Sequence, residues 1–192
     1  MRIEHIKASE LSTNKWAGGT TTQLAIYPKD AEYKKQNFLF RISSATVETN
    51  ESKFTKLPKT SRKLMILEGE INIEHKNHHS KMIKKFEQEE FSGDWDTKSY
   101  GKATDFNLML KGKSTGEMEA ITFDTFKTIS LKPDFKFYGF YIFKGEAKLS
   151  INDQYIHAHK GDFIRLVLEN EIKTMDLKVI SVGEVIVSKV NY

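Results

Sequence analysis

The chain of 192 residues contains no cysteine and only three prolines. The absence of cysteine excludes disulfide bonds, thiolate nucleophiles and metal sites built on thiolates, and it is typical of a reducing compartment. No apolar stretch approaches the ~20 residues that cross a bilayer. The N-terminal sequence MRIEHIKASELSTNKW also lacks the apolar core of a signal peptide. We therefore expect a cytoplasmic protein with no membrane partner.

A strong charge of one sign is also missing. The net charge is +4, from 30 basic and 26 acidic residues spread along the whole chain. The one dense basic run, residues 81–85, is followed closely by Glu87, Glu89 and Glu90. Proteins that bind nucleic acids typically gather their basic residues into a patch or stripe. We therefore expect no nucleic-acid partner.

The sequence also lacks a sustained helical period, and residues 8–15 are expected to contain no more than one short helical turn. β-Branched and aromatic residues instead form short runs between turn residues, which predicts strands. The expected strands are residues 20–27, 38–46, 63–68, 70–75, 105–110, 119–123, 139–143, 147–151, 162–167 and 186–190. Many short strands at even spacing favour antiparallel sandwiches or barrels.

Two stretches of the chain resemble each other. Residues 64–75 read LMILEGEINIEH and residues 140–151 read FYIFKGEAKLSI, each with an apolar run, Gly-Glu and then alternation. A repeated unit predicts two similar β-modules. The predicted fold is all-β, with two jelly-roll barrels in tandem and few short helices. We place the barrels at residues 1–112 and 113–192, separated near the polar segment 111–116 and allowing for exchanged strands.

A series of short motifs in the first half resembles the HutD/Ves family of the cupin superfamily. The matching pieces are, in order, Trp16 with Gly18 and Gly19, residues 41–45 with Arg-Ile-Ser, Phe54 with Pro58 and Arg62, Phe91 with Gly93 and Asp94, and DFNLM at residues 105–109. Their order makes chance a poor explanation. The chain departs from the family pattern at Ala17 and Gln23, where Asn and Glu are common. The resemblance implies a bicupin fold and an association with histidine utilisation.

Metal-binding cupins place a His-x-His pair and a Glu before the Gly-Glu turn, followed by a later His. This chain has no histidine before Gly69 from residue 47 onward, and none shortly before Gly145. His157 and His159 share a strand face but flank a predicted loop, so we expect solvent-facing side chains. His75, His78 and His79 are interpreted as polar surface on an exposed hairpin. We therefore expect no metal and no cofactor.

Two predicted strands carry polar residues on one face. Arg41 and Ser43 alternate with apolar neighbours, as do Asp105 and Asn107. Arginine can grip a carboxylate with two parallel hydrogen bonds, and asparagine offers both a donor and an acceptor. The candidate ligand-binding residues are Trp16, Arg41, Ser43, Arg62, Asp94, Asp105 and Asn107. In the alternative reading, Arg41 and Asp105 form a structural ion pair, Asp94 caps a turn and Trp16 plugs the barrel.

The leading hypothesis is a bicupin without a metal that binds a small carboxylate-bearing metabolite. An amino acid or a histidine-breakdown product such as formylglutamate fits this chemistry, in a sensor or regulator of catabolism. An alternative is an enzyme acting on a small polar metabolite, either through Asp105 or Asp94 as general base or through a metal. No Gly-x-Ser-x-Gly elbow is present, and the sequence assigns no catalytic residue. The cupin resemblance also allows a homodimer paired through edge strands.

Overall fold

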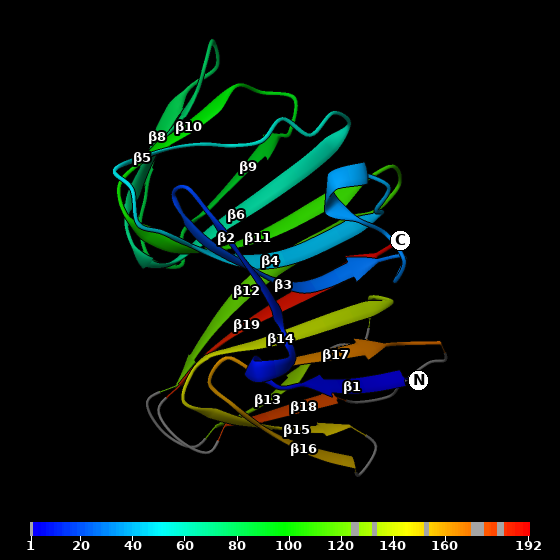
Figure 1. The fold of residues 1–192 in the computed structure, drawn as a ribbon. Coiled ribbons are helices and arrows are strands. Elements are labelled where there is room, and N and C mark those ends of the chain that lie inside the picture. Colours follow the sequence, from blue (N-terminus) through cyan, green and yellow to red (C-terminus); the bar gives the residue numbers. More distant parts are fainter. Residues whose placement is uncertain (1, 124–126, 132–133, 152–153, 170–174, 180–182) are drawn as a thin grey trace. The chain divides into compact units, whose positions relative to one another are not determined.

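The computed structural model describes residues 2–123, 127–131, 134–151, 154–169, 175–179 and 183–192. Antiparallel β-strands dominate these residues (Figure 1). Helical conformation in the described part is limited to two 3₁₀ turns, η1 (Ala8–Glu10) and η2 (Tyr33–Lys35), and neither could span a bilayer. The all-β prediction is confirmed.

The chain divides into two compact units. The first unit comprises Ser12–Thr115 together with Tyr192, and the second comprises Met1–Leu11 and Gly116–Asn191. The sequence prediction placed the division between the barrels at 112/113 and allowed for strands exchanged between them. It also assigned the N-terminal residues to the first barrel. In the structure, strand β1 (Arg2–Ile6) instead pairs with β17 (Phe163–Val167) of the second unit.

The first unit contains two antiparallel sheets. The larger has the order β2-β3-β4-β11-β6-β9 and the smaller has the order β5-β10-β7-β8. The strands of the larger sheet are β2 (Ser12–Trp16), β3 (Gly19–Tyr27), β4 (Phe40–Val47), β6 (Thr60–Gly69), β9 (Gln88–Ser92) and β11 (Ala103–Lys111). Those of the smaller sheet are β5 (Glu51–Lys53), β7 (Ile71–His75), β8 (Ser80–Ile83) and β10 (Thr97–Tyr100).

The second unit also contains two sheets, ordered β1-β17-β14-β19-β12 and β13-β18-β15-β16. In addition to β1 and β17, its strands are β12 (Thr115–Phe123), β13 (Lys127–Leu131), β14 (Phe137–Lys144), β15 (Glu146–Ile151), β16 (Gln154–His159), β18 (Met175–Val179) and β19 (Gly183–Asn191). All ten strands expected from the sequence are present in the two units. The expected helical turn is confined to η1, because residues 12–16 form β2 and pair with β3.

The repeated Gly-Glu motif marks the point where the chain leaves one sheet for the other. Gly69 joins β6 to β7, and Gly145 joins β14 to β15. Both glycines have positive φ angles, +81° and +74°, which residues with a Cβ adopt at a cost. A Cβ on Gly69 would also lie 2.5 Å from the Lys102 carbonyl oxygen. The motif is therefore a geometric requirement of both units.

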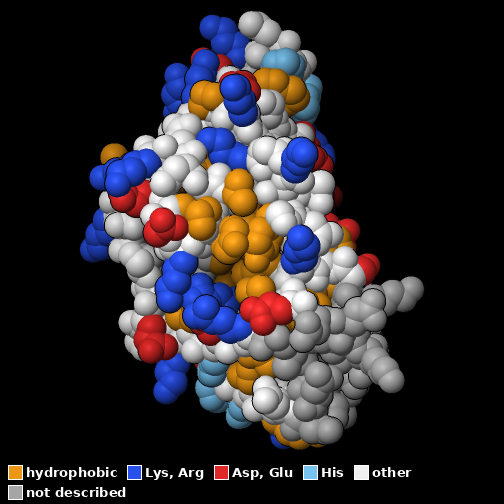
Figure 2. Space-filling view, turned by 90° about the vertical axis from the view of Figure 1, so that its right-hand side faces the viewer, with side chains coloured by type: hydrophobic (Ala, Val, Ile, Leu, Met, Phe, Trp, Pro, Cys, Tyr) orange, Lys and Arg blue, Asp and Glu red, His pale blue; other side chains and the backbone are white. Residues whose placement is uncertain are grey.

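Each unit buries apolar side chains from both of its sheets. In the first unit, Leu64 and Ile66 of β6 pack with Ile71 and Ile73 of β7. In the second unit, the buried cluster includes Phe140 and Ile142 of β14 and Leu149 of β15. On the described part of the face in Figure 2, acidic side chains lie among the basic ones, without one continuous basic stripe.

Candidate functional site

Three neighbouring strands of the first unit place polar side chains on one face of the larger sheet. Alternation along β4 directs Arg41 and Ser43 to the same side, and alternation along β11 does so for Asp105 and Asn107. Antiparallel pairing sets Asn107 opposite Ser43. Met109 stands between Arg41 of β4 and Arg62 of β6, so two guanidiniums belong to one row across the sheet.

These residues line a cavity of about 670 Å³. Its wall includes six of the seven residues predicted from the sequence: Trp16, Arg41, Ser43, Arg62, Asp105 and Asn107. Gln23 of β3, Tyr33 of η2 and Phe54, which follows β5, complete the part of the wall that contacts the arginines. A volume of this size accommodates a small metabolite.

Arg41 is buried and held by several neighbours. Its Nε donates to Gln23 Oε1 at 3.0 Å, and its Nη1 donates to Ser43 Oγ at 3.0 Å. The guanidinium also lies over the Tyr33 ring, 4.3 Å from the centroid. Burial lowers the pKa of Arg41, while Tyr33 and Asp105 oppose that shift. These contacts fix the guanidinium without a direct ion pair among the described residues.

Arg62 is buried between two aromatic rings. Its guanidinium carbon lies 4.8 Å from the centroid of Phe54 and 5.2 Å from that of Phe91. Its Nη1 makes one long bond, 3.4 Å, to the Thr55 carbonyl, and its Nε has no hydrogen-bond partner among the described residues. Burial lowers the pKa of Arg62 to about 10, so the side chain remains a cation at neutral pH. Its hydrogen-bonding capacity is therefore largely unused.

Asp105 and Asn107 supply the acidic and amide groups of the wall. Burial raises the pKa of Asp105 to about 7, although Arg62 and Arg41 act in the opposite direction. The carboxyl group therefore changes its charge near neutral pH. The side-chain oxygen of Asn107 is buried, and no described residue forms a hydrogen bond with it. Because buried polar atoms are normally satisfied, this oxygen and Arg62 Nε are groups that a bound ligand or water would complete.

Trp16 lies at the edge of the cavity. It is 40% exposed and belongs to β2, the edge strand of the larger sheet. Its indole covers Gly18, where an added Cβ would come within 2.1 Å of the ring. The glycine therefore allows the indole to fold back beside the cavity, where its face can stack on a planar ligand.

Asp94 is the one predicted site residue outside the cavity wall. It is exposed in the turn between β9 and β10, where its Oδ2 accepts a hydrogen bond from the Lys59 N–H at 3.2 Å. The alternative prediction, in which Asp94 caps its own turn, differs from this contact with a separate loop. The sequence analysis did not predict Gln23 or Tyr33 as site residues. Gln23 was noted only as a departure from the family pattern, and Tyr33 belongs to a short turn that has no periodic pattern.

The family comparison agrees with the motifs found in the first half of the chain and extends the match. The HutD family model matches residues 8–187. The chain belongs to the HutD family. No curated protein sequence matches it.

Solved structures share the fold of this HutD-family chain at low sequence identity. A conserved protein of unknown function from Pseudomonas aeruginosa PAO1 matches with a TM-score of 0.86 and 15% identity over 100% of both chains. HutD from Pseudomonas fluorescens SBW25, solved in a formate condition, matches with a TM-score of 0.76 and 15% identity over 99% of this chain and 98% of that one.

A bacterial pirin from Escherichia coli, solved with nickel(II), matches with a TM-score of 0.70 and 10% identity over 98% of both chains. Together with the family match, these similarities confirm a cupin-type fold.

His157 and His159 differ from His75 in their exposure to solvent. His157 and His159 are exposed, as expected, and lie near Glu146. The interpretation of the His75 hairpin as polar surface is wrong for His75, which is 1% exposed. Its ring packs against Phe91 and Trp95, contacts between segments that no local sequence pattern indicates.

Proposed function

We propose that the cavity of the first unit binds a small metabolite bearing a carboxylate, and that the cytoplasmic protein acts as a sensor or regulator of amino-acid catabolism. The observation that carries the proposal is the pair of buried guanidiniums in one wall, together with the unpartnered Arg62 Nε and Asn107 Oδ1. Histidine breakdown is the favoured pathway because of the family. An N-formyl amino acid such as formylglutamate has carboxylates for the arginines and an amide for Asn107.

The composition of the wall favours an anion over a metal ion. Among the described residues that line it are two arginines and no histidine, and their carboxylates are those of Glu32 and Asp105. Guanidiniums cannot be deprotonated readily and repel a cation, whereas they attract a carboxylate. For this reason we do not extend the nickel of the Escherichia coli pirin to this cavity.

Calorimetry with formate, formylglutamate and uncharged N-formyl amides tests the proposal. We expect formylglutamate to bind and the uncharged N-formyl amides not to bind. Arg41→Met and Asn107→Ala should each weaken binding, the arginine change by about 30-fold or more because a buried charged partner is lost. Arg165→Met, which removes a guanidinium paired with Glu4 in the second unit, is the matched control and should leave binding unchanged. If the Arg41→Met and Asn107→Ala variants bound every responsive carboxylate as tightly as the parent protein does, the pocket assignment would be refuted.

A second candidate function is metal-independent catalysis with Asp105 as general base. The observation in its favour is the pKa of about 7, which suits proton transfer at neutral pH. Turnover of a bound metabolite by the purified protein, lost in Asp105→Asn while binding persists, would support this function. Binding without any turnover would favour the sensor.

A further inference from the structure

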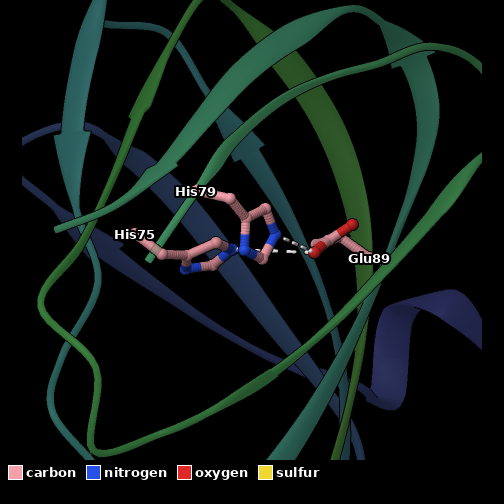
Figure 3. Close-up of side chains that lie close together, drawn as sticks. All are labelled: His75, His79 and Glu89. Atoms are coloured by element: carbon pink, nitrogen blue, oxygen red, sulfur yellow. Dashed lines mark hydrogen bonds and ion pairs between the residues drawn. The ribbon is translucent and has the colours of Figure 1, made fainter. Parts of the chain in front are cut away.

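A cluster of two histidines and a glutamate lies outside the cavity wall of the first unit. His75 ends β7, His79 immediately precedes β8 and Glu89 belongs to β9. The three side chains point toward one another, as Figure 3 shows, and their ligand atoms all lie within 4.8 Å. The Nε2 atoms of His79 and His75 lie 2.8 and 3.9 Å from the same oxygen, Glu89 Oε1.

Two polar contacts hold His75 in place, one through its backbone and one through its ring. His75 N–H donates to the His79 carbonyl at 2.8 Å, which closes the hairpin and brings residues four apart together. The His75 ring is fixed at its other nitrogen, because Nδ1 lies 2.8 Å from the buried Thr97 Oγ1. Metal-binding histidines are typically oriented in this way through the nitrogen that does not bind the metal.

The second observation that points to a ligand is the state of His75 Nε2. This atom is buried and has no hydrogen-bond partner in the part of the chain that the structure describes, and the side chain has no exposed surface. At 3.9 Å, Glu89 Oε1 is too distant for a hydrogen bond. When Nδ1–H donates to Thr97, the Nε2 lone pair faces the carboxylate and has nothing to accept.

We propose that His75 Nε2, His79 Nε2 and Glu89 Oε1 form a binding site for one divalent first-row transition-metal ion, with zinc as the reference ion. Two imidazoles and a carboxylate suit zinc, nickel or cobalt better than magnesium or calcium, which prefer all-oxygen sites. Three protein ligands leave a position for water. The ion would clamp the β7–β8 hairpin to β9, and this proposal is independent of metabolite binding in the cavity.

Access and charge at the cluster are consistent with a bound cation. The His79 side chain is 45% exposed, so an ion can enter from that side. Lys81 Nζ lies 2.8 Å from Glu89 Oε2, the oxygen that the site does not use. Burial, together with His79, His78 and Arg62, lowers the pKa of His75, while Glu89 opposes this shift.

Zinc titration of untagged, chelator-treated protein tests this site. We expect about one equivalent of zinc to bind, and His79→Ala and Glu89→Gln each to weaken binding by about tenfold or more. His78→Ala is the matched control, because His78 is adjacent in sequence but stacks on Trp95 and is not part of the cluster. The double variant His157→Ala/His159→Ala removes two exposed imidazoles near Glu146 in the second unit. It should also leave zinc binding unchanged.

Trp95 provides a second readout that does not depend on stoichiometry. Its ring centroid lies 5.1 Å from that of His75 and 6.0 Å from that of His79. In a Trp16→Phe background it is the single tryptophan, and Cu²⁺ or Co²⁺ at the site should quench its emission. The proposal is overturned if zinc does not bind at micromolar concentrations, or if His79→Ala and Glu89→Gln bind zinc and quench as the parent protein does.

Discussion

The two units use the same strand pairing and fill it with different side chains. β11 pairs with β6 in the first unit, and β19 pairs with β14 in the second. Both pairings contain a register shift. It lies between Thr104 and Asp105 of β11 in the first unit, and between Ile142 and Lys144 of β14 in the second. On β6 and β14 the shift lies just before the repeated glycine, so the two strand pairs can be compared position by position.

The comparison shows three exchanges of chemistry. Opposite Ile66 stands Asp105, whereas opposite the equivalent Ile142 stands Val185. One step further, Asn107 in the first unit is replaced by Val187 in the second. The position of Arg62 on β6 is taken by Tyr138 on β14. The exchanged residues of the first unit consequently line a polar cavity, whereas those of the second belong to a cluster of buried hydrophobic side chains among the described residues.

This difference shows that the backbone register and the interior chemistry of a unit are set by separate residues. Gly69 and Gly145 determine where each chain changes sheet, and neither contributes a side chain to the interior. One face of β11 or β19 can then carry either polar side chains that bind a ligand or apolar side chains that form the core. Function is therefore a property of the site and not of the shared fold.

The largest expected effect comes from moving the acid into the wrong unit. Val185→Asp places a carboxylate where the fully buried Val185 packs with Phe140 and Ile142. The described members of that cluster are hydrophobic side chains, which offer a carboxylate no cationic partner. We expect a loss of about 3–5 kcal/mol in the free energy of unfolding, measured by urea denaturation.

Val185→Ala is the control for this change, because it removes methyl groups without adding a charge. We expect it to cost roughly 1–3 kcal/mol through the cavity left behind. If Val185→Asp were no more damaging than Val185→Ala, the second interior would tolerate polarity and the contrast between the units would fail.

The next effect concerns the pH dependence of ligand binding in the first unit. Asp105 has a raised pKa of about 7, so it is neutral below that pH and negative above it. A negative Asp105 competes with the ligand for Arg41 and Arg62. Formylglutamate should therefore bind about tenfold more tightly at pH 6 than at pH 8. Asp105→Asn should remove this dependence, and calorimetry in buffers of matched ionic strength measures it.

Stability without a ligand checks the same group. The pKa of Asp105 is about 7 in the folded state and 3.8 for an ordinary aspartate, so the folded protein binds more protons between these two values. Its contribution to the free energy of unfolding is fully present below about pH 4 and is lost as the pH rises through about 7. A parent protein with the same pH profile as Asp105→Asn would show that the carboxyl group does not titrate in this range.

Much of this comparison could be predicted from the sequence because it depends on local patterns. The Gly-Glu repeat indicated two β-modules, and simple alternation indicated that Arg41 with Ser43, and Asp105 with Asn107, share faces. Six predicted residues therefore line one cavity. Asp94 does not, because its exposed carboxylate accepts a hydrogen bond from the Lys59 N–H of another loop.

The rest could not be predicted because it depends on contacts between distant segments. β5, β8 and β10 contain three or four residues each, too few to show a period. β1 belongs to the second unit through pairing with β17, which is more than 150 residues away in sequence. His75 is buried by Phe91 and Trp95 although its own sequence neighbours are polar.

The smallest expected effect tests what Tyr138 does at the position that Arg62 occupies in the first unit. Its hydroxyl donates to Asp134 Oδ1 and accepts from the Phe135 N–H, each at 3.0 Å, so its role is structural. Tyr138→Phe should cost about 1 kcal/mol of unfolding free energy and leave formylglutamate binding unchanged. Tyr155→Phe, at an exposed position, should change stability by less than about 0.5 kcal/mol. Weaker metabolite binding in Tyr138→Phe, with stability retained, would assign a ligand-dependent role to the second interior and remove the distinction between the two units.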